Sequence, residues 1–159
     1  MKDKSGGGAR GVNNVSTSSK HENAKRGRVG MDAAEKFLPK FGFSDVKRVD
    51  RMGEGCDFEA VRDSVRCKIE VKTTGKEGVP DAFETEFTEL DKHPKFRPDY
   101  LLVVRLGEGW KLKGAHLVSK NDVDRYKKRH KIVKHVKFSS EFKKDLWEKK
   151  IGKWLDWTA

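Results

Sequence analysis

The chain has 159 residues, 38% of them charged, with a formal net charge of +11. This length suits a single domain with one buried core. The positive surplus attracts polyanions, so nucleic acid is a more natural partner than a small neutral molecule. No stretch approaches the roughly 18 consecutive apolar residues of a membrane-spanning helix, and no signal peptide is evident. We therefore expect a cytoplasmic protein that does not engage membranes.

The amino-terminal composition differs from the rest of the chain. Residues 1–28 contain Gly, Ser, Asn, Lys and Arg but almost no apolar residues, and such segments bury too little surface to offset their ordering entropy. We predict a disordered basic tail over residues 1–28 and a single domain over residues 29–157. Whether the tail contacts phosphates or is only solvated stays open.

A helix is predicted where the domain begins, at about Met31. Four apolar residues there follow the helical spacing i, i+3, i+4 and i+7: Ala34, Phe37, Leu38 and Phe41. Gly42 is a natural stop after them, and Pro39 should kink or shorten the last turn.

Further elements follow from the alternation and composition of the chain. Strands are predicted at Val46 to Val49, Asp57 to Val61, Val65 to Val71, Tyr100 to Arg105, Trp110 to Val118 and Ile132 to Phe138. Helices are predicted at Glu84 to Lys92, from the capping pair Ser119 and Asp122 to about Arg129, and from Ser140 to Trp154, with Gly152 as a break. This order indicates an α/β fold with a mixed β-sheet flanked by helices and an αβββαβ core.

Three charged residues stand out within the second and third predicted strands. Glu70 and Lys72 are separated by one residue on a strand, so their side chains leave the same face of the sheet. Asp57 lies on the preceding strand with 12 residues between it and Glu70, and a hairpin of that length can bring the two carboxylates together. Carboxylates bind Mg²⁺ through hard oxygen ligands, and a nearby lysine can position water or stabilise negative charge. The set suits phosphodiester hydrolysis.

These residues also carry a resemblance to a known family. Gly55-Cys56-Asp57-Phe58 followed by Ile69-Glu70-Val71-Lys72-Thr73-Thr74 resembles the D…E-x-K motif of the PD-(D/E)XK nuclease superfamily, which includes restriction endonucleases. Together with Thr88-Glu89 and the strand Asp99 to Arg105, it is similar to the NO VEIN C-terminal domain family within that superfamily. The resemblance covers roughly residues 30 to 120, and Cys56 stands where the family name has proline.

The resemblance implies a restriction endonuclease-like fold and a set of roles. Asp57 and Glu70 would ligate Mg²⁺, with Mn²⁺ as a substitute, and the backbone carbonyl of Val71 would add a ligand. Lys72 would orient the attacking water, and Glu35 would be the glutamate that members often contribute from the first helix. Members often pair two active sites, so a homodimer is a further expectation.

Two other sets of charged residues have competing interpretations. A basic run is expected to track DNA phosphates, although it could equally be a solvated face: Arg125, Lys127, Lys128, Arg129, Lys131 and Lys134. Glu59 competes with Asp57 as the strand carboxylate or is a surface charge. Glu70 and Lys72 taken alone could be an exposed ion pair of the kind common on sheets.

The sequence therefore predicts a Mg²⁺-dependent endonuclease that hydrolyses phosphodiester bonds in DNA. Two alternatives remain: a non-catalytic nucleic-acid-binding module with the same fold, and a subunit of a restriction or repair assembly that is active only with its partners. Steeply salt-dependent binding without cleavage would favour the former.

Overall fold

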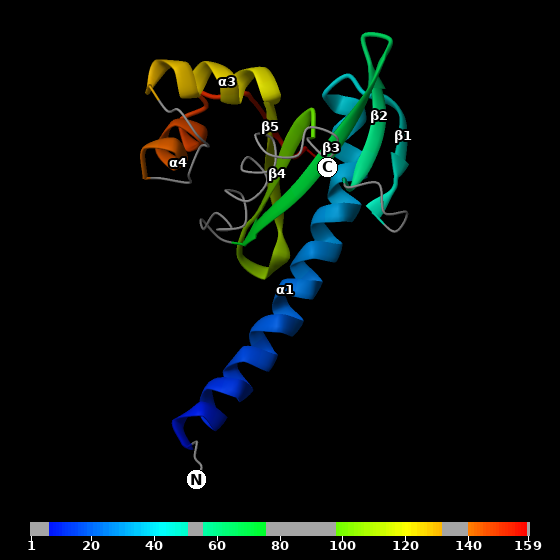
Figure 1. Cartoon of the computed structure of the whole chain (residues 1–159). Coiled ribbons are helices and arrows are strands. Elements are labelled where there is room, and N and C mark those ends of the chain that lie inside the picture. The colour runs from blue at the N-terminus through cyan, green and yellow to red at the C-terminus, as the bar shows by residue number, and fades with distance from the viewer. Residues whose placement is uncertain (1–6, 51–55, 76–97, 132–139, 159) are drawn as a thin grey trace.

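A computed structural model of the chain describes residues 7–50, 56–75, 98–131 and 140–158, with side chains described for residues 24–50, 56–74, 98–131 and 144–158. The described residues form a six-stranded sheet with helices on both of its faces (Figure 1). The predicted α/β class with a mixed sheet is thereby confirmed.

The elements follow one another in the chain as listed here: α1 (Gly7–Lys40), β1 (Ser44–Arg48), β2 (Phe58–Arg62), β3 (Val65–Gly75), β4 (Tyr100–Leu106), the 3-10 helix η3 (Glu108–Trp110), β5 (Leu112–Ser119), α3 (Lys120–Arg129), α4 (Ser140–Trp147) and β6 (Lys153–Asp156). The strands lie in the sheet in chain order. β3 and β4 are parallel, and the other neighbouring pairs are antiparallel. Parallel neighbours need a crossover connection; here it includes the predicted helix Glu84 to Lys92, which lies outside the described residues.

A tight hairpin joins β2 to β3. Its two turn residues, Asp63 and Ser64, both have positive φ angles of 52° and 65°, as in the type I′ turns that match the twist of paired strands. Arg62 pairs with Val65, and the register continues to Phe58 opposite Ile69. The turn therefore lies between the two strands predicted at Asp57 to Val61 and Val65 to Val71.

The two faces of the sheet bury separate apolar clusters. Under α1, buried helix residues pack on strand residues of one face, including Phe37, Leu38, Phe58, Cys67, Ile69, Val71, Leu102 and Val104. On the opposite face a smaller cluster lies beneath α3 and α4: Leu101, Val103, Val118, Val123, Tyr126, Leu146 and Ile151. Alternation along each strand thus divides the sheet into an α1 face and an α3/α4 face.

Helix α1 confirms the predicted apolar stripe but begins much earlier than Met31. It starts at Gly7, and its first turns project beyond the sheet (Figure 1). Extending a helix whose last turns are anchored is less unfavourable than nucleating a new one, and no proline precedes Pro39 to stop it. Pro39 lies in the last turn, which ends at Lys40. The predicted disorder of residues 1–28 in solution stays a prediction.

The carboxyl-terminal region confirms one helix and corrects another. Ser119 and Asp122 form a capping box at the start of α3. The helix predicted from Ser140 to Trp154, however, ends at Trp147, and Trp154 lies on β6 opposite His116 of β5. Lys149 and Gly152 have positive φ angles of 64° and 69°, which helices do not tolerate. The predicted strand Ile132 to Phe138 lies outside the described residues.

Among the described residues, no helix has both the length and the apolar character needed to cross a membrane.

Candidate active site

The β2–β3 hairpin brings Asp57, the residue just before β2, next to Glu70 of β3. Phe58 of β2 pairs with Ile69 of β3, and the Asp57 amide donates a 3.0 Å hydrogen bond to the Ile69 carbonyl. The side chains of Asp57 and Glu70 are hydrogen-bonded to each other. The two-residue turn therefore explains how carboxylates far apart in the sequence meet.

Glu70 and Lys72 project from the α3/α4 face of β3, away from α1. The Lys72 ammonium lies 3.8 Å from a Glu70 carboxylate oxygen, and both side chains are less than one-fifth exposed. Ion pairs that are partly withdrawn from water are screened less than those on the open surface. This low exposure argues against the alternative that Glu70 and Lys72 form an ordinary ion pair on the solvent-exposed surface of a sheet.

Asp57 is fixed by the backbone of the neighbouring strand. One of its carboxylate oxygens accepts a 2.8 Å hydrogen bond from the Val71 amide. Burial raises the pKa of Asp57 above its ordinary value, while the Val71 amide, the Lys72 charge and a hydrogen bond with Glu70 counteract that rise. The structure thus brings Asp57, Glu70 and Lys72 into one interacting group.

The other two residues assigned by resemblance have different surroundings. The side chain of Val71 is buried in the cluster under α1, so its backbone alone is available to the site. Glu35 pairs with Arg48, at 2.7 Å, and the Arg48 guanidinium lies over the Phe58 ring on the α1 face. Glu35 is therefore engaged on that side of the sheet, and its role in catalysis stays a prediction.

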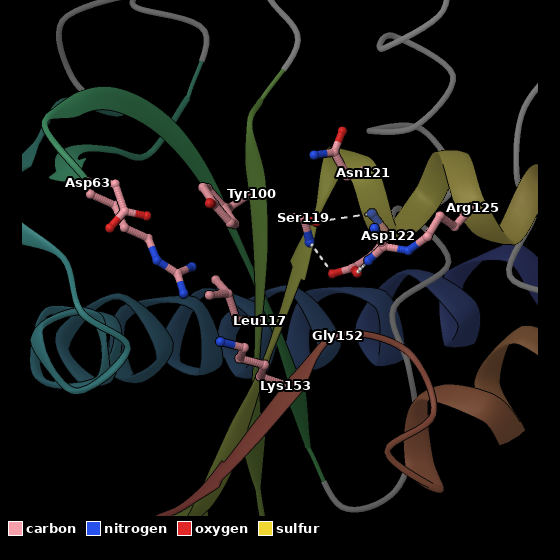
Figure 2. Close-up of a pocket in the computed structure, with 10 residues that line it drawn as sticks. Asp63, Tyr100, Leu117, Ser119, Asn121, Asp122, Arg125, Gly152 and Lys153 are labelled. Atoms are coloured by element: carbon pink, nitrogen blue, oxygen red, sulfur yellow. Dashed lines mark hydrogen bonds and ion pairs between the residues drawn. The ribbon is translucent and has the colours of Figure 1, made fainter.

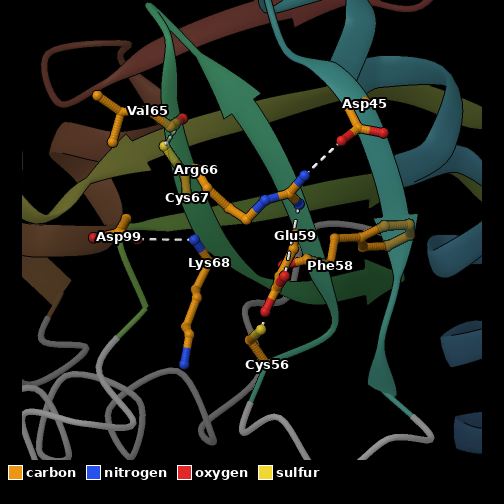
Figure 3. Close-up of polar contacts among 9 residues, drawn as sticks. All are labelled: Asp45, Cys56, Phe58, Glu59, Val65, Arg66, Cys67, Lys68 and Asp99. Atoms are coloured by element: carbon orange, nitrogen blue, oxygen red, sulfur yellow. Dashed lines mark hydrogen bonds and ion pairs between the residues drawn. The ribbon is translucent and has the colours of Figure 1, made fainter.

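Glu59 belongs to a separate network of ion pairs. Arg66 of β3 reaches both Asp45 of β1 and Glu59 of β2, the latter at 3.6 Å (Figure 3). A carboxylate already paired with an arginine is a poorer candidate for a metal ligand than one beside a second carboxylate. This geometry favours Asp57 over Glu59 as the functional carboxylate.

Most of the predicted DNA-binding residues lie on or just after α3. Arg125 pairs with Asp122, and Arg129 lies 3.5 Å from Asp145. Lys128 and Lys131 are exposed; Lys127 also has an interaction within the protein, and Lys134 lies outside the described residues. Basic residues in the last turn also stabilise the helix dipole. A role in DNA binding stays a prediction.

The α3/α4 face contains a buried polar residue that the sequence analysis did not single out. His116 is fully buried, with its ring parallel to Trp147 at 5.1 Å and 4.5 Å from Trp154. Within the described part of the chain, neither ring nitrogen has a hydrogen-bond partner. Burial, then the charges of Arg105 and Lys149, lower the pKa of His116 from 6.5 to about 3. The alternation of residues along β5 predicts which face of the sheet His116 lies on. Its burial depends on packing against distant residues, which the sequence does not show.

A metal at this site would depend on few side chains. The described residues contain no cluster of three or more His, Cys, Asp or Glu side chains suited to a metal ion. Asp57 and Glu70 are thus the candidate side-chain ligands. Cys56 and Cys67 are free and buried, and burial raises the pKa of the Cys56 thiol to about 11, which keeps it protonated.

Comparison with known proteins finds no matching family model, no matching curated protein and no matching solved structure.

Proposed function

We propose that the protein is a metal-dependent nuclease with a restriction endonuclease-like fold that hydrolyses phosphodiester bonds in DNA. The observation that carries the proposal is the meeting of Asp57, Glu70 and Lys72 on one face of the sheet. Two carboxylates and an ammonium, each partly withdrawn from water, match the chemical needs of phosphodiester cleavage. The parallel β3–β4 pair after an antiparallel hairpin is compatible with the αβββαβ core.

The donor set fits Mg²⁺. This ion is usually held by one or two carboxylates and keeps positions for waters and substrate phosphates, so a closed cage of side chains is not required. A divalent cation would also favour the charged form of Asp57, which burial disfavours. Bound Mg²⁺ would neutralise negative charge on the scissile phosphate and lower the pKa of the attacking water.

The protein's own residues would divide the remaining work. The Val71 amide holds the Asp57 carboxylate in one orientation, so little reorganisation is needed when the ligand binds. Lys72 would orient the attacking water and stabilise negative charge on the phosphate. The carboxylate of Glu70 would hold the Lys72 ammonium in place. Burial of the pair makes both effects stronger than they would be on an exposed strand.

Charge supports nucleic acid as the substrate. The net charge of +11 attracts a polyanion at long range, and the exposed Lys128 and Lys131 add positive charge near α3. A binding module without catalytic activity would have the same attraction. Only the carboxylate and lysine group distinguishes the two functions, so the decisive test must act on that group.

A pair of variants, at Asp57 just before β2 and at Glu59 on β2, tests the assignment. Asp57→Asn removes the metal-binding charge while keeping the shape of a partly buried side chain, so we expect the fold to remain and cleavage of a labelled DNA duplex in Mg²⁺ to fall at least about a hundredfold. Glu59→Gln, two residues further along the chain, is the matched control and should cleave like the wild type. Equal activity in Asp57→Asn and wild type would contradict the proposal.

A further inference from the structure

A cleft lies at the end of the sheet where the β2–β3 turn meets the start of α3 (Figure 2). Its volume is about 430 Å³, within the range of pockets that hold small ligands. The argument concerns six of its lining residues: Arg62, Tyr100, Ser119, Asn121, Arg125 and Lys153. We call it the Arg62 cleft.

The Arg62 cleft is separate from the candidate active site. Tyr100 and Leu117, which form part of its wall, pack with the cluster on the α1 face. Glu70 and Lys72 project from the opposite face of the sheet. Asp57, Glu70 and Lys72 do not line the cleft, so we expect a ligand to bind there without the proposed metal.

Arg62 is held in place by aromatic rings. Its guanidinium lies 5.3 Å from the centre of the Phe43 ring and 5.5 Å from that of Tyr100. Stacking of this kind orients the planar group and leaves its N–H edges available to a ligand. Within the described part of the chain, neither Arg62 nor Lys153 forms an ion pair, so both charges are available.

The acidic residues of the Arg62 cleft do not cancel this charge. Asp122 accepts a hydrogen bond from the Ser119 amide at 2.9 Å and pairs with Arg125. Asp63, on the hairpin turn, is the remaining carboxylate against Arg62 and Lys153. Because the capping box already engages the start of α3, side chains rather than helix amides would bind an anion here.

We propose that the Arg62 cleft binds a phosphate monoester, carried by a free nucleotide or by the end of a nucleic acid strand. The forked N–H groups of Arg62 suit two phosphate oxygens, and Lys153 supplies a second charge for the dianion. The hydroxyls of Ser119 and Tyr100 and the amide of Asn121 add neutral donors. This site goes beyond the proposed nuclease function and requires no metal.

The test is isothermal titration of the full chain in EDTA with two pairs of probes. One pair is deoxyadenosine monophosphate and deoxyadenosine, and the other is a short DNA oligonucleotide with and without a 5′-phosphate. We expect each phosphorylated probe that fits to bind about tenfold or more tightly than its unphosphorylated partner. The tighter of the two phosphorylated probes identifies the source of the phosphate.

Variants locate the binding. Arg62→Met and Lys153→Met should each weaken binding of the phosphorylated probe about tenfold, and Lys153 is exposed, so its variant should fold even if Arg62→Met does not. Lys111→Met, just before β5, should bind like the wild type. Equal affinity for phosphorylated and unphosphorylated probes, or unchanged binding in Lys153→Met, would overturn the proposal.

Discussion

The partly buried Asp57 and the buried His116 differ in how far their polar groups find partners. Asp57 has a backbone donor, a neighbouring ammonium and a hydrogen bond with Glu70. His116 instead is enclosed by the aromatic rings of Trp147 and Trp154 and faces the positive charges of Arg105 and Lys149. Uncompensated burial favours the neutral form of a histidine, so His116 should affect stability rather than carry charge.

The lowered pKa of His116 predicts a loss of stability in acid. The unfolded chain binds a proton near the ordinary value of 6.5, whereas the folded protein does so only at about 3. As the pH falls below 6.5, protonation therefore stabilises the unfolded chain, and the free energy of unfolding contributed by this residue falls toward pH 3. From about pH 7 to about pH 5 the loss should be on the order of 1 to 2 kcal/mol.

Urea unfolding of the wild type and His116→Phe at both pH values measures this effect. Phenylalanine keeps a flat ring against the tryptophans and has no nitrogen to protonate. The wild type should lose more stability than His116→Phe on acidification, because the remaining titratable groups are the same in both proteins. Parallel losses in the two proteins would show that His116 is not the buried neutral base described above.

At the scale of elements, Gly152 sets the boundary between α4 and β6. Its φ angle is +69°, and an added Cβ would lie 2.2 Å from the Leu117 carbonyl oxygen. Gly152→Ala should therefore lower the free energy of unfolding by about 2 kcal/mol or more, from backbone strain and steric overlap together.

Gly109→Ala separates these two causes. Gly109 has a similar φ of +67°, but nothing lies within 4 Å of its added Cβ. It should show only the strain, about 1 to 2 kcal/mol. Thermal unfolding compares the two variants. Equal losses of stability would mean that close packing of Gly152 against β5 adds nothing to the backbone strain.

Local sequence patterns predict an element well when the residues that form it are close together in the chain. The two-residue turn at Asp63 and Ser64 fixes the pairing of β2 with β3, and that pairing brings Asp57 near Glu70. The core of the candidate site was therefore accessible from the sequence. The capping box at Ser119 was accessible for the same reason, since its chemistry is local.

Features that depend on contacts between distant segments could not be predicted from the sequence. Trp147, Ile151 and Trp154 fit a helical stripe equally well, but Trp154 is recruited to the sheet by pairing with β5. The early start of α1 likewise has no local signal, because few apolar residues precede Met31. The Arg62 cleft combines residues from five elements, so no single segment of the sequence indicates it.

For the whole molecule, the positive charge predicts salt-dependent DNA binding. Each lysine that contacts a phosphate releases counterions, which steepens the fall of affinity with salt by about 0.9 in a double-logarithmic plot. Lys128→Ala and Lys131→Ala should therefore each reduce that slope by about 1. Exposed Lys47 lies on β1, and Lys47→Ala is the matched control. Fluorescence anisotropy over a salt series measures the slopes. Identical slopes in all three variants would contradict a contact between DNA and the lysines at the end of α3.

Cleavage of supercoiled plasmid by the wild type and Lys72→Ala, each with Mg²⁺ or EDTA, tests the central claim most directly. We expect nicked or linear DNA only from the wild type with Mg²⁺, because Lys72 stabilises charge that develops during phosphodiester cleavage. Gel shift in EDTA should be similar for both proteins. Cleavage by Lys72→Ala at the wild-type rate, or DNA binding by the wild type without cleavage in Mg²⁺ or Mn²⁺, would contradict the account.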